Sequence, residues 1–147
     1  MTKLLNEAIE KQVREALAGM KEPVQVLFFG SQQNCPACGD TRQLVEEVAA
    51  LSDKISLAVH DVDADAALAA QYRVDKTPGL VIAAKDGDTV TDYGVRLSGI
   101  PAGHEFTTLI QDLLIVSGRD SGLGAATREF LKSLEKPVHL QVFVTPT

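Results

Sequence analysis

The sequence predicts an α/β protein in which helices cover the faces of a sheet. Apolar runs of strand length alternate with amphipathic helical segments over residues 1–118. The chain has 147 residues, of which 45% are hydrophobic, so it can bury a core without disulfide or metal support. These two observations make a layered α/β sheet the expected fold class.

Charge and hydropathy argue against two classes of partner. The formal net charge is −6, and Lys and Arg form no cluster of the kind that phosphate contacts require, so no nucleic acid is expected. No apolar run approaches the roughly 20 residues of a membrane helix. Glutamates interrupt the apolar pattern of residues 1–20, which is not typical of a signal peptide. We therefore expect a cytoplasmic protein that binds no membrane.

The first expected elements are an N-terminal helix and a buried strand. Apolar residues recur every three or four positions over residues 5–20, with charged residues between them, which is typical of an amphipathic helix. Pro23 ends this helix, and the mostly apolar run 24–29 has the length of a buried strand. A polar loop over 30–34 then leads to Cys35.

The second helix is predicted to begin at Pro36, because proline suits the first helical position. Glycine and proline turns separate the later elements. In order, these are a strand over 55–59 that ends near Asp61, a helix over 64–72, a turn over 77–79, a strand over 80–84, a tight turn over 86–88, a strand over 89–97 and a helix over 106–116 that Ser117 and Gly118 end.

Residues 128–143 repeat residues 14–29 without a gap, at a constant offset of 114. The six identities are Arg14, Glu15, Leu17, Pro23, Val24 and Phe29 with their partners. We therefore expect one unit over 1–118 with its N-terminal helix, a linker over 119–124, and the first helix and strand of a second, truncated unit over 125–147.

Cys35 and Cys38 are the only cysteines, and their spacing indicates redox chemistry. Cys35 lies at the N-terminus of a predicted helix, where unpaired N–H groups and the helix dipole favour a thiolate. Cys38 is close enough to form a disulfide with it, so Cys35 is the expected nucleophile and Cys38 the resolving thiol. A zinc site is the alternative, but there is no second C-x-x-C and the histidines lie in separate elements, so no metal is expected.

The acidic segment 61–65 has the spacing at which a calcium loop begins. Such a loop needs Gly at its sixth position and Glu at its twelfth, where this chain has Ala66 and Tyr72. We expect these acids to cap the following helix instead. His60, just before them, is expected to have a structural role.

Two motifs carry a resemblance to a known family. Asn34-Cys35-Pro36-Ala37-Cys38 follows a strand, and the helical segment 67–76 leads into Thr77-Pro78. These motifs resemble the thioredoxin fold. Together with the repeat and the segments 92–96, 99–106 and 138–147, they make the chain look like the protein disulfide oxidoreductases with two thioredoxin units, also called glutaredoxin-like proteins. The resemblance implies a thioredoxin-like fold: a central mixed β-sheet flanked by helices, here with an extra N-terminal helix.

The resemblance also implies thiol-disulfide oxidoreductase activity on protein disulfides, with Cys35 and Cys38 as catalytic residues and a role in cell redox homeostasis. Pro78 would be cis and lie opposite the dithiol, and the backbone at Thr77 would pair with an extended substrate peptide. The residues that would shape the site at the helix N-terminus are Asn34, Pro36 and Ala37. The redox-active disulfide would need no further cofactor, and a thioredoxin-reductase-like flavoprotein or glutathione would regenerate the dithiol.

The chain departs from the thioredoxin pattern at three places. Asn34 replaces the tryptophan before the first cysteine, which removes an aromatic contact for substrate. Gly79 follows the proline where threonine is usual, and we expect it to loosen the site. Residues 24–29 contain no acid to match the buried aspartate of thioredoxin, so the proton acceptor of Cys38 is unassigned.

Two other functions are compatible with these residues. The first is an electron-relay domain for a peroxidase system, resembling the N-terminal domain of the alkyl hydroperoxide reductase flavoprotein, which also doubles this fold. The second is a non-catalytic docking or holdase module whose missing second unit carries the main active site. In either case, the apolar face formed by alternate residues of 138–144 predicts a chain that forms a homodimer, swaps or frays at its C-terminal strand.

Overall fold

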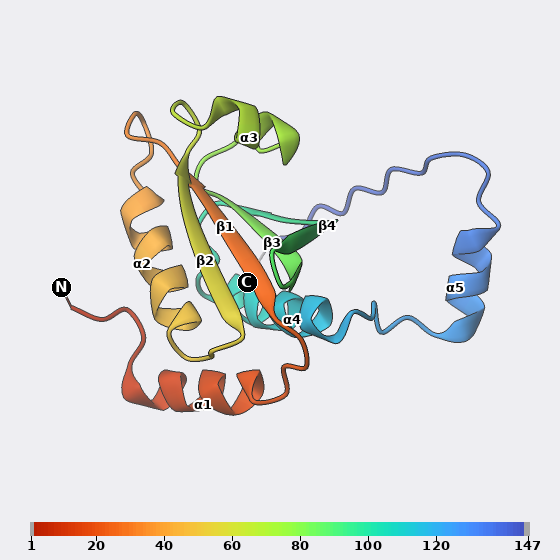
Figure 1. Ribbon diagram of the computed structural model, residues 1–147, viewed down its shortest axis with the longest axis horizontal. Helices are drawn as coiled ribbons and strands as arrows, with labels where there is room; N and C mark the ends of the chain where they lie inside the picture. The colour runs from red at the N-terminus through yellow and green to blue at the C-terminus, as the bar shows by residue number, and fades with distance from the viewer. Residues whose placement is uncertain (1, 146–147) are drawn as a thin grey trace.

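A computed structural model describes residues 2–145 and shows a four-stranded sheet with helices on both faces (Figure 1). The predicted α/β architecture is confirmed. In chain order, the elements are α1 (Glu7–Leu17), β1 (Val24–Gly30), α2 (Cys38–Ala49), β2 (Ile55–Asp61), α3 (Ala66–Gln71), β3 (Gly79–Asp86), β4 (Thr89–Ser98), α4 (His104–Gly118) and α5 (Ala125–Lys132). Within the described residues, no helix has the length and hydrophobicity needed to cross a membrane.

The sheet is mixed, with the strand order β2-β1-β3-β4. β1 is parallel to β2 and antiparallel to β3, and β3 forms an antiparallel hairpin with β4. The register shifts between Ile82 and Ala84, where β3 meets β4 irregularly. β1 therefore has a hydrogen-bonded partner on each side, and all seven of its residues are buried.

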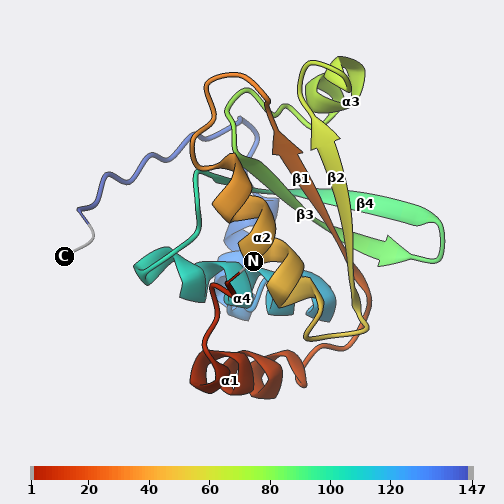
Figure 2. The same cartoon turned by 90° about the vertical axis from the view of Figure 1, so that its left-hand side faces the viewer.

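The side chains of β1 alternate between two cores, as expected for a strand. Val24, Val26 and Phe28 pack into the larger core, to which α1, α2 and α4 contribute. Leu27 and Phe29 pack into the smaller core with residues of α3 and the loop after it. Figure 2 shows α2 and α4 on one side of the strands, away from α3. The apolar residues on both faces of β1 account for its central position.

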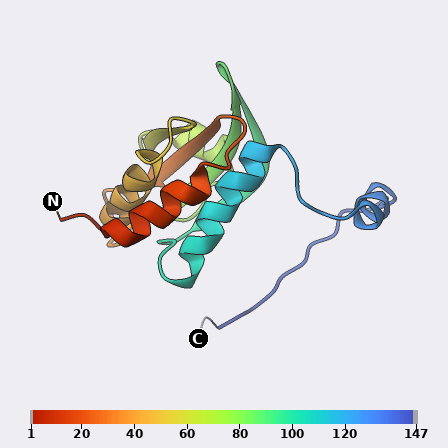
Figure 3. The ribbon, with the colours of Figure 1, turned by 90° about the horizontal axis from the view of Figure 1, so that it is seen from below.

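The predicted N-terminal helix is confirmed as α1, which lies beside α4 at one end of the sheet (Figure 3). Asn6 caps α1 by accepting a hydrogen bond from the Ile9 amide at 2.9 Å. Val13 and Leu17 of α1 are buried in the larger core. The amide of Leu5 donates to Glu47 of α2 at 2.8 Å, which fastens the segment before α1 to the domain.

Helix α3 is shorter than the helix predicted over 64–72. The carboxylate of Asp61 accepts hydrogen bonds from the amides of Asp63 at 2.9 Å and Ala64 at 3.2 Å. These bonds hold the residues after β2 in a turn, so the helix begins at Ala66.

Helix α4 ends at Gly118, so the predicted end at Ser117 and Gly118 is confirmed, and both residues are still helical. Ser117 is fully buried, and its hydroxyl accepts from the amides of Lys21 at 2.8 Å and Glu22 at 3.1 Å. The same hydroxyl donates to the Glu22 carbonyl at 2.7 Å. Ser117 thus joins α4 to the turn between α1 and β1.

Arg119 ends α4 in a left-handed conformation, with a φ of 53°. Its guanidinium donates to the carbonyl oxygens of Val116 at 2.7 Å and Pro23 at 3.0 Å. It also bonds the Asp86 carboxylate at 3.0 Å. The point at which the chain leaves the domain is therefore fixed against the end of the sheet.

The C-terminal region differs from its prediction. Residues 120–124 are coil, α5 follows, and residues 133–145 contain no strand, although the repeat predicts one from 138 onward. Figure 1 shows α5 and this segment extending away from the sheet. The matching strand β1 is paired on both sides, whereas residues 138–145 have no neighbouring strand, and an unpaired strand is not stable in water. The last two residues of the predicted second unit, 146–147, lie outside the described residues.

Candidate functional site

The two cysteines lie between the end of β1 and the start of α2, and they form a disulfide with a Cα–Cα distance of 5.3 Å. The amide of Cys38 donates to the Cys35 carbonyl at 3.1 Å, which closes a tight turn around Pro36 and Ala37. Asn34, just before the turn, has a φ of 52°, a left-handed conformation that asparagine tolerates better than most residues. Both cysteines are half-buried.

Pro36 does not occupy the first helical position as predicted. Helix α2 begins at Cys38, with Ala37 as its N-cap residue. The reason is that the hydrogen bond from Cys38 to Cys35 joins residues three apart, as in a turn, and not four apart, as in an α-helix. The first helical bond runs from the Thr41 amide to the Ala37 carbonyl at 3.0 Å. Cys35 therefore lies just before the helix, where the free N–H groups of its first turn still favour a thiolate.

Cys38 packs against the end of β1. A Cβ atom on Gly30 would lie 3.5 Å from the Cys38 sulfur and 2.8 Å from a ring carbon of Phe28. The amide of Ser31 donates to the Cys38 sulfur at 3.5 Å, which would stabilise negative charge there. The absence of a side chain at Gly30 therefore leaves room for the Phe28 ring, and the Cys38 sulfur lies at ordinary contact distance from the same position.

The predicted cis bond between Thr77 and Pro78 is confirmed. Pro78 comes directly before Gly79, which pairs with Phe29 in the antiparallel register of β1 and β3. The cis bond thus lies at the end of the sheet where β1 leads into the cysteine turn. The Gly99 amide donates to the Pro78 carbonyl at 2.9 Å and holds this loop to the end of β4.

Gly79 tightens the loop, contrary to the expectation that it would loosen the site. A Cβ atom at this position would lie 2.7 Å from a methyl group of Val74 and 2.8 Å from the Lys76 carbonyl. Real Cβ atoms do not approach other atoms so closely, and one of these neighbours is backbone. Glycine is therefore needed for the close approach of the loop to β3.

A cavity of about 470 Å³ adjoins Cys38 at the edge of the sheet. Its lining residues are Phe28, Gly30, Ser31, Gln32, Cys38, Gly39, Arg42, Val59, His60, Asp61 and Asp65. Sequence reasoning did not place any residue of β2 near the cysteines. The alternation of side chains along β2 could have indicated them, because Val59 and Asp61 pair with Phe28 and Gly30 of β1 and so point to the same face of the sheet.

The structure agrees with a structural role for His60. The His60 ring stacks on Phe29 at 5.2 Å between centroids, and its Nδ1 lies 3.1 Å from an Asp65 carboxylate oxygen. Among residues 2–145, no three His, Cys, Asp or Glu side chains form a group that could hold a metal ion.

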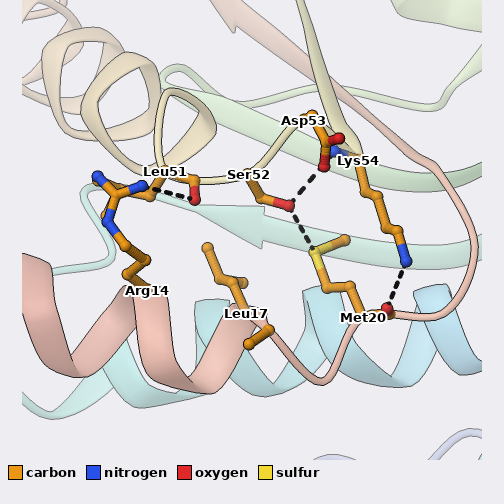
Figure 4. Close-up of a pocket in the computed structure, with 8 residues that line it drawn as sticks. Arg14, Leu17, Met20, Leu51, Ser52, Asp53 and Lys54 are labelled. Carbon is orange, nitrogen blue, oxygen red and sulfur yellow. Dashed lines mark hydrogen bonds between the residues drawn. The ribbon is translucent and has the colours of Figure 1, made fainter.

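A second cavity, of about 390 Å³, lies between α1 and the loop that joins α2 to β2 (Figure 4). Its polar side chains bond to nearby groups of the domain itself. Lys54 donates to the Met20 carbonyl at 2.8 Å, and Arg14 lies 3.5 Å from the Leu51 carbonyl. β1 starts at this end of the sheet, so the cavity lies far from the cysteines, and its cationic groups serve to join α1 to the domain.

The comparisons with known proteins agree with this geometry. Residues 23–111 match the family described as "Thioredoxin domain". The chain belongs to the thioredoxin-domain family. The matched range runs from the start of β1 into α4 and includes both cysteines and Pro78. The predicted thioredoxin-like fold and the resemblance to a redox family are thereby confirmed.

Within this family, the chain is similar to larger redox proteins. A protein disulfide oxidoreductase structure from Aeropyrum pernix is 32% identical with a TM-score of 0.75, and the match covers 90% of this chain and 57% of that one. The NTD_N/C domain of alkylhydroperoxide reductase AhpF from Enterococcus faecalis is 25% identical with a TM-score of 0.77, over 90% of this chain and 62% of that one.

A curated relative extends the same comparison. The alkyl hydroperoxide reductase AhpF of Staphylococcus epidermidis is 26% identical over 144 residues. The alignment covers 98% of this chain and 25% of the relative, so the chain spans about a quarter of that protein's length. The similarity therefore supports a thioredoxin-like disulfide oxidoreductase domain. It does not extend to the activity of the whole relative, most of which lies outside the alignment.

Proposed function

We propose that this chain is a thiol-disulfide oxidoreductase unit that acts on protein disulfides through Cys35 and Cys38. The observation that carries the proposal is the disulfide between them, at the end of the central strand where the cis bond before Pro78 also lies. Asn34, Pro36 and Ala37 shape the turn that holds the two sulfurs together. The dithiol is the redox group, and no further cofactor is needed.

In the reducing direction, the Cys35 thiolate attacks one sulfur of a substrate disulfide. A bond forms between Cys35 and that sulfur, and the second substrate sulfur leaves as a thiolate and takes up a proton. Cys38 then loses its proton and attacks Cys35, which releases the first substrate sulfur and forms the Cys35–Cys38 disulfide. The substrate gains two electrons, and glutathione or a thioredoxin-reductase-like flavoprotein returns the domain to the dithiol.

The loop before β3 is the proposed place for the substrate peptide. Thr77 is half-buried and Pro78 is buried, and the bond from the Gly99 amide fixes the loop. An extended peptide can pair with the Thr77 backbone as a short added strand, which would bring its disulfide to Cys35.

Reduction of insulin disulfides in the presence of a dithiol donor tests the proposal. We expect Cys35→Ser to reduce the rate to the uncatalysed background, because the attacking sulfur is lost. Cys38→Ser should still attack but retain the substrate as a mixed disulfide, visible by intact mass. If Cys35→Ser keeps the wild-type rate, the proposal is wrong. If neither the wild type nor Cys35→Ser reduces insulin, but both bind the same protein partner, a docking or holdase module is the better interpretation.

A second candidate is an electron relay within a peroxidase system. It is favoured by the similarity of almost the whole chain to the staphylococcal alkyl hydroperoxide reductase AhpF. The test is electron transfer from NADH to the Cys35–Cys38 disulfide by a flavoprotein reductase that lacks its own dithiol domain. Dithiol formation faster with this reductase than with glutathione would support the relay, and no transfer would exclude it.

We also propose that residues 125–147 are the first helix and strand of a second thioredoxin-fold unit, after a linker over 119–124. The repeat of residues 14–29 supports this division. So does the exposure of the apolar residues Phe130, Leu140, Val142, Phe143 and Val144, which a second unit would cover. The test is whether residues 138–144 become protected from hydrogen exchange in a chain that supplies the remaining strands of such a unit.

A further inference from the structure

The resolving step requires a proton acceptor for Cys38, if the proposed function is correct. A thiol must lose its proton before or as it attacks. On the β1 side, the Cys38 sulfur faces the end of the strand, where the neighbouring side chain on the same face is Phe28. Phe28 is 3% exposed and cannot accept a proton. The acceptor must therefore lie elsewhere around Cys38.

The cavity beside Cys38 offers a route for the proton. Its volume of about 470 Å³ exceeds the roughly 30 Å³ share of one water molecule many times over. Phe28 and Val59 form an apolar part of its lining, whereas Ser31, Asp61 and Asp65 add polar groups. Water in this space can connect Cys38 to a carboxylate without direct contact.

The strand register places Asp61 on the same face of the sheet as Cys38. β1 and β2 are parallel, with Phe28 level with Val59 and Gly30 level with Asp61. Side chains at paired positions point to the same face, and the earlier β2 residues Ile55 and Leu57 do pack into the core that contains Phe28 and contacts Cys38. Asp61 therefore follows Val59 on that face and is level with Gly30, where a Cβ atom would lie 3.5 Å from the Cys38 sulfur.

His60 and Asp65 also line the cavity, and they are bonded to each other. Asp65 in addition accepts from the Asp61 amide at 3.3 Å. The geometry disfavours His60, because its ring stacks on Phe29, which belongs to the smaller core on the opposite face of the sheet. Its Nδ1 is already paired with Asp65 at 3.1 Å. His60 reaches the cavity only at the edge of the sheet, where the two faces meet.

We propose that Asp61 accepts the Cys38 proton through water in this cavity. The acid that thioredoxin carries on its central strand has thus moved to the neighbouring strand β2. As Cys38 attacks Cys35, its proton passes through water to the Asp61 carboxylate, the Cys35–Cys38 bond forms, and the substrate sulfur leaves with the electron pair of the broken bond. The proton then returns to solvent.

The hydrogen bonds of Asp61 keep it ionised. Backbone amides, first that of Ala64 and then that of Asp63, hold the pKa of this carboxyl below its ordinary value of 3.8, so it is a carboxylate at neutral pH. The same bonds make it a weak base, so it holds the proton only briefly before passing it to solvent. Besides Cys38, the other charged or titratable groups that line the cavity are Arg42 from α2, His60 near the end of β2 and Asp65 at the N-cap of α3. Arg42 is paired with Glu46 at 2.7 Å, which leaves Asp61 without a fixed cationic partner among these groups.

The test follows the mixed disulfide that the reduced protein forms with oxidised glutathione. Acid quenching and intact mass give its formation and its decay separately. We expect Asp61→Asn to form the adduct at the wild-type rate but to lose it at least about tenfold more slowly near pH 7. The asparagine oxygen still accepts the amides of Asp63 and Ala64, so the turn is kept. Decay in this variant should also rise about tenfold per pH unit, since solvent then removes the proton, whereas wild-type decay should be flatter.

Two variants serve as controls. Asp63→Asn removes a nearby charge outside the cavity and should decay like the wild type. His60→Gln tests the other base. Equal slowing in Asp61→Asn and Asp63→Asn would indicate a general charge effect and overturn the proposal, as would slowing in His60→Gln alone or wild-type decay in Asp61→Asn. If the wild type forms no adduct at all, the failure lies with the proposed function and not with Asp61.

Discussion

Residues 14–29 and residues 128–143 share six identical positions, yet they differ in structure. In the first copy, the strand β1 is the centre of the sheet, and Phe29 is fully buried. In the second copy, the matching residues are unpaired coil, and Phe143 is 89% exposed. The helices differ less, because α1 and α5 both form.

This difference shows which structure a segment can form alone. A helix makes its backbone hydrogen bonds within its own residues, so α5 needs no neighbouring segment to supply them. A strand needs partners, and β1 has β2 on one side and β3 on the other. Residues 138–144 match β1 in sequence, but within the described residues they have no neighbouring strand.

Hydrogen exchange should show the largest contrast. Amides of Val26 to Phe28 should exchange about 10⁴-fold or more below unprotected rates, because they open only with the domain. Amides of 138–144 should lie within about tenfold of unprotected rates at low protein concentration. Protection that appears together with a dimer at high concentration would fit the expected homodimer. If the protein sediments as a monomer and the amides of 138–144 are protected, both the expected fraying and the expected homodimer are contradicted.

Truncating the matched phenylalanines should give the next largest contrast. Phe29→Ala removes a fully buried ring and should lower the free energy of unfolding by about 3 to 5 kcal/mol. Phe143→Ala removes an exposed ring and should change it by less than about 0.5 kcal/mol. Urea denaturation monitored by circular dichroism measures both. A comparable loss in the two variants would mean that the second copy is packed in solution.

The junctions between helix and strand offer a smaller contrast. Ser117→Ala leaves the Lys21 amide without its buried acceptor and the Glu22 carbonyl without the hydroxyl donor, although the Glu22 amide keeps its bond to the backbone carbonyl of residue 117. This loss should cost about 1 to 3 kcal/mol in the same experiment. Ser133, in the second copy, is exposed and donates to the Phe130 carbonyl at 2.6 Å. Ser133→Ala is the matched control and should be neutral within about 0.5 kcal/mol. An unchanged Ser117→Ala variant would show that this junction is not needed.

The smallest expected effect is the loss of a local contact at low pH. The Gly122 amide and the Arg128 side chain hold the pKa of Asp120 below its ordinary value of 3.8. Because the pKa is lowered in the folded protein, the bonds of Asp120 to Gly122 and Arg128 are intact above 3.8 and are lost as the pH falls through the lowered pKa. Amide signals of Gly122 and Arg128 should therefore move below about pH 3.8, before those of β1, and Asp120→Asn should abolish the transition. A midpoint above 3.8 would contradict the assignment.

Much of the fold could be predicted because patterns along the chain report burial directly. The apolar residues on both faces of β1 predicted a central strand, and the strand-to-helix position of Cys35 and Cys38 predicted the place of the disulfide. Errors arose where hydrogen bonds override a local pattern. Asp61 shortens α3, and the turn at Cys35 delays the start of α2 past Pro36.

The surroundings of the site were harder to predict, because they depend on distances between elements. Glycine at position 79 suggested a loose loop, but the contacts with Val74 and Lys76 leave no room for a side chain. Asp61 looked like a helix cap, and only the register of β2 against β1 places it on the same sheet face as Cys38. Neither relation can be derived from the spacing of residues in the sequence.

Arg119 also determines how far the C-terminal residues can reach. Its bonds to Pro23 and Asp86 fix the origin of the linker, and residues 120–124, fully extended, span about 17 Å. Residues 138–144 follow this linker, α5 and residues 133–137, and a segment on a tether of this length has an effective concentration in the millimolar range near its own domain. Any surface that the same chain offers to residues 138–144 is therefore favoured over one on a second molecule, unless the protein itself approaches millimolar concentration.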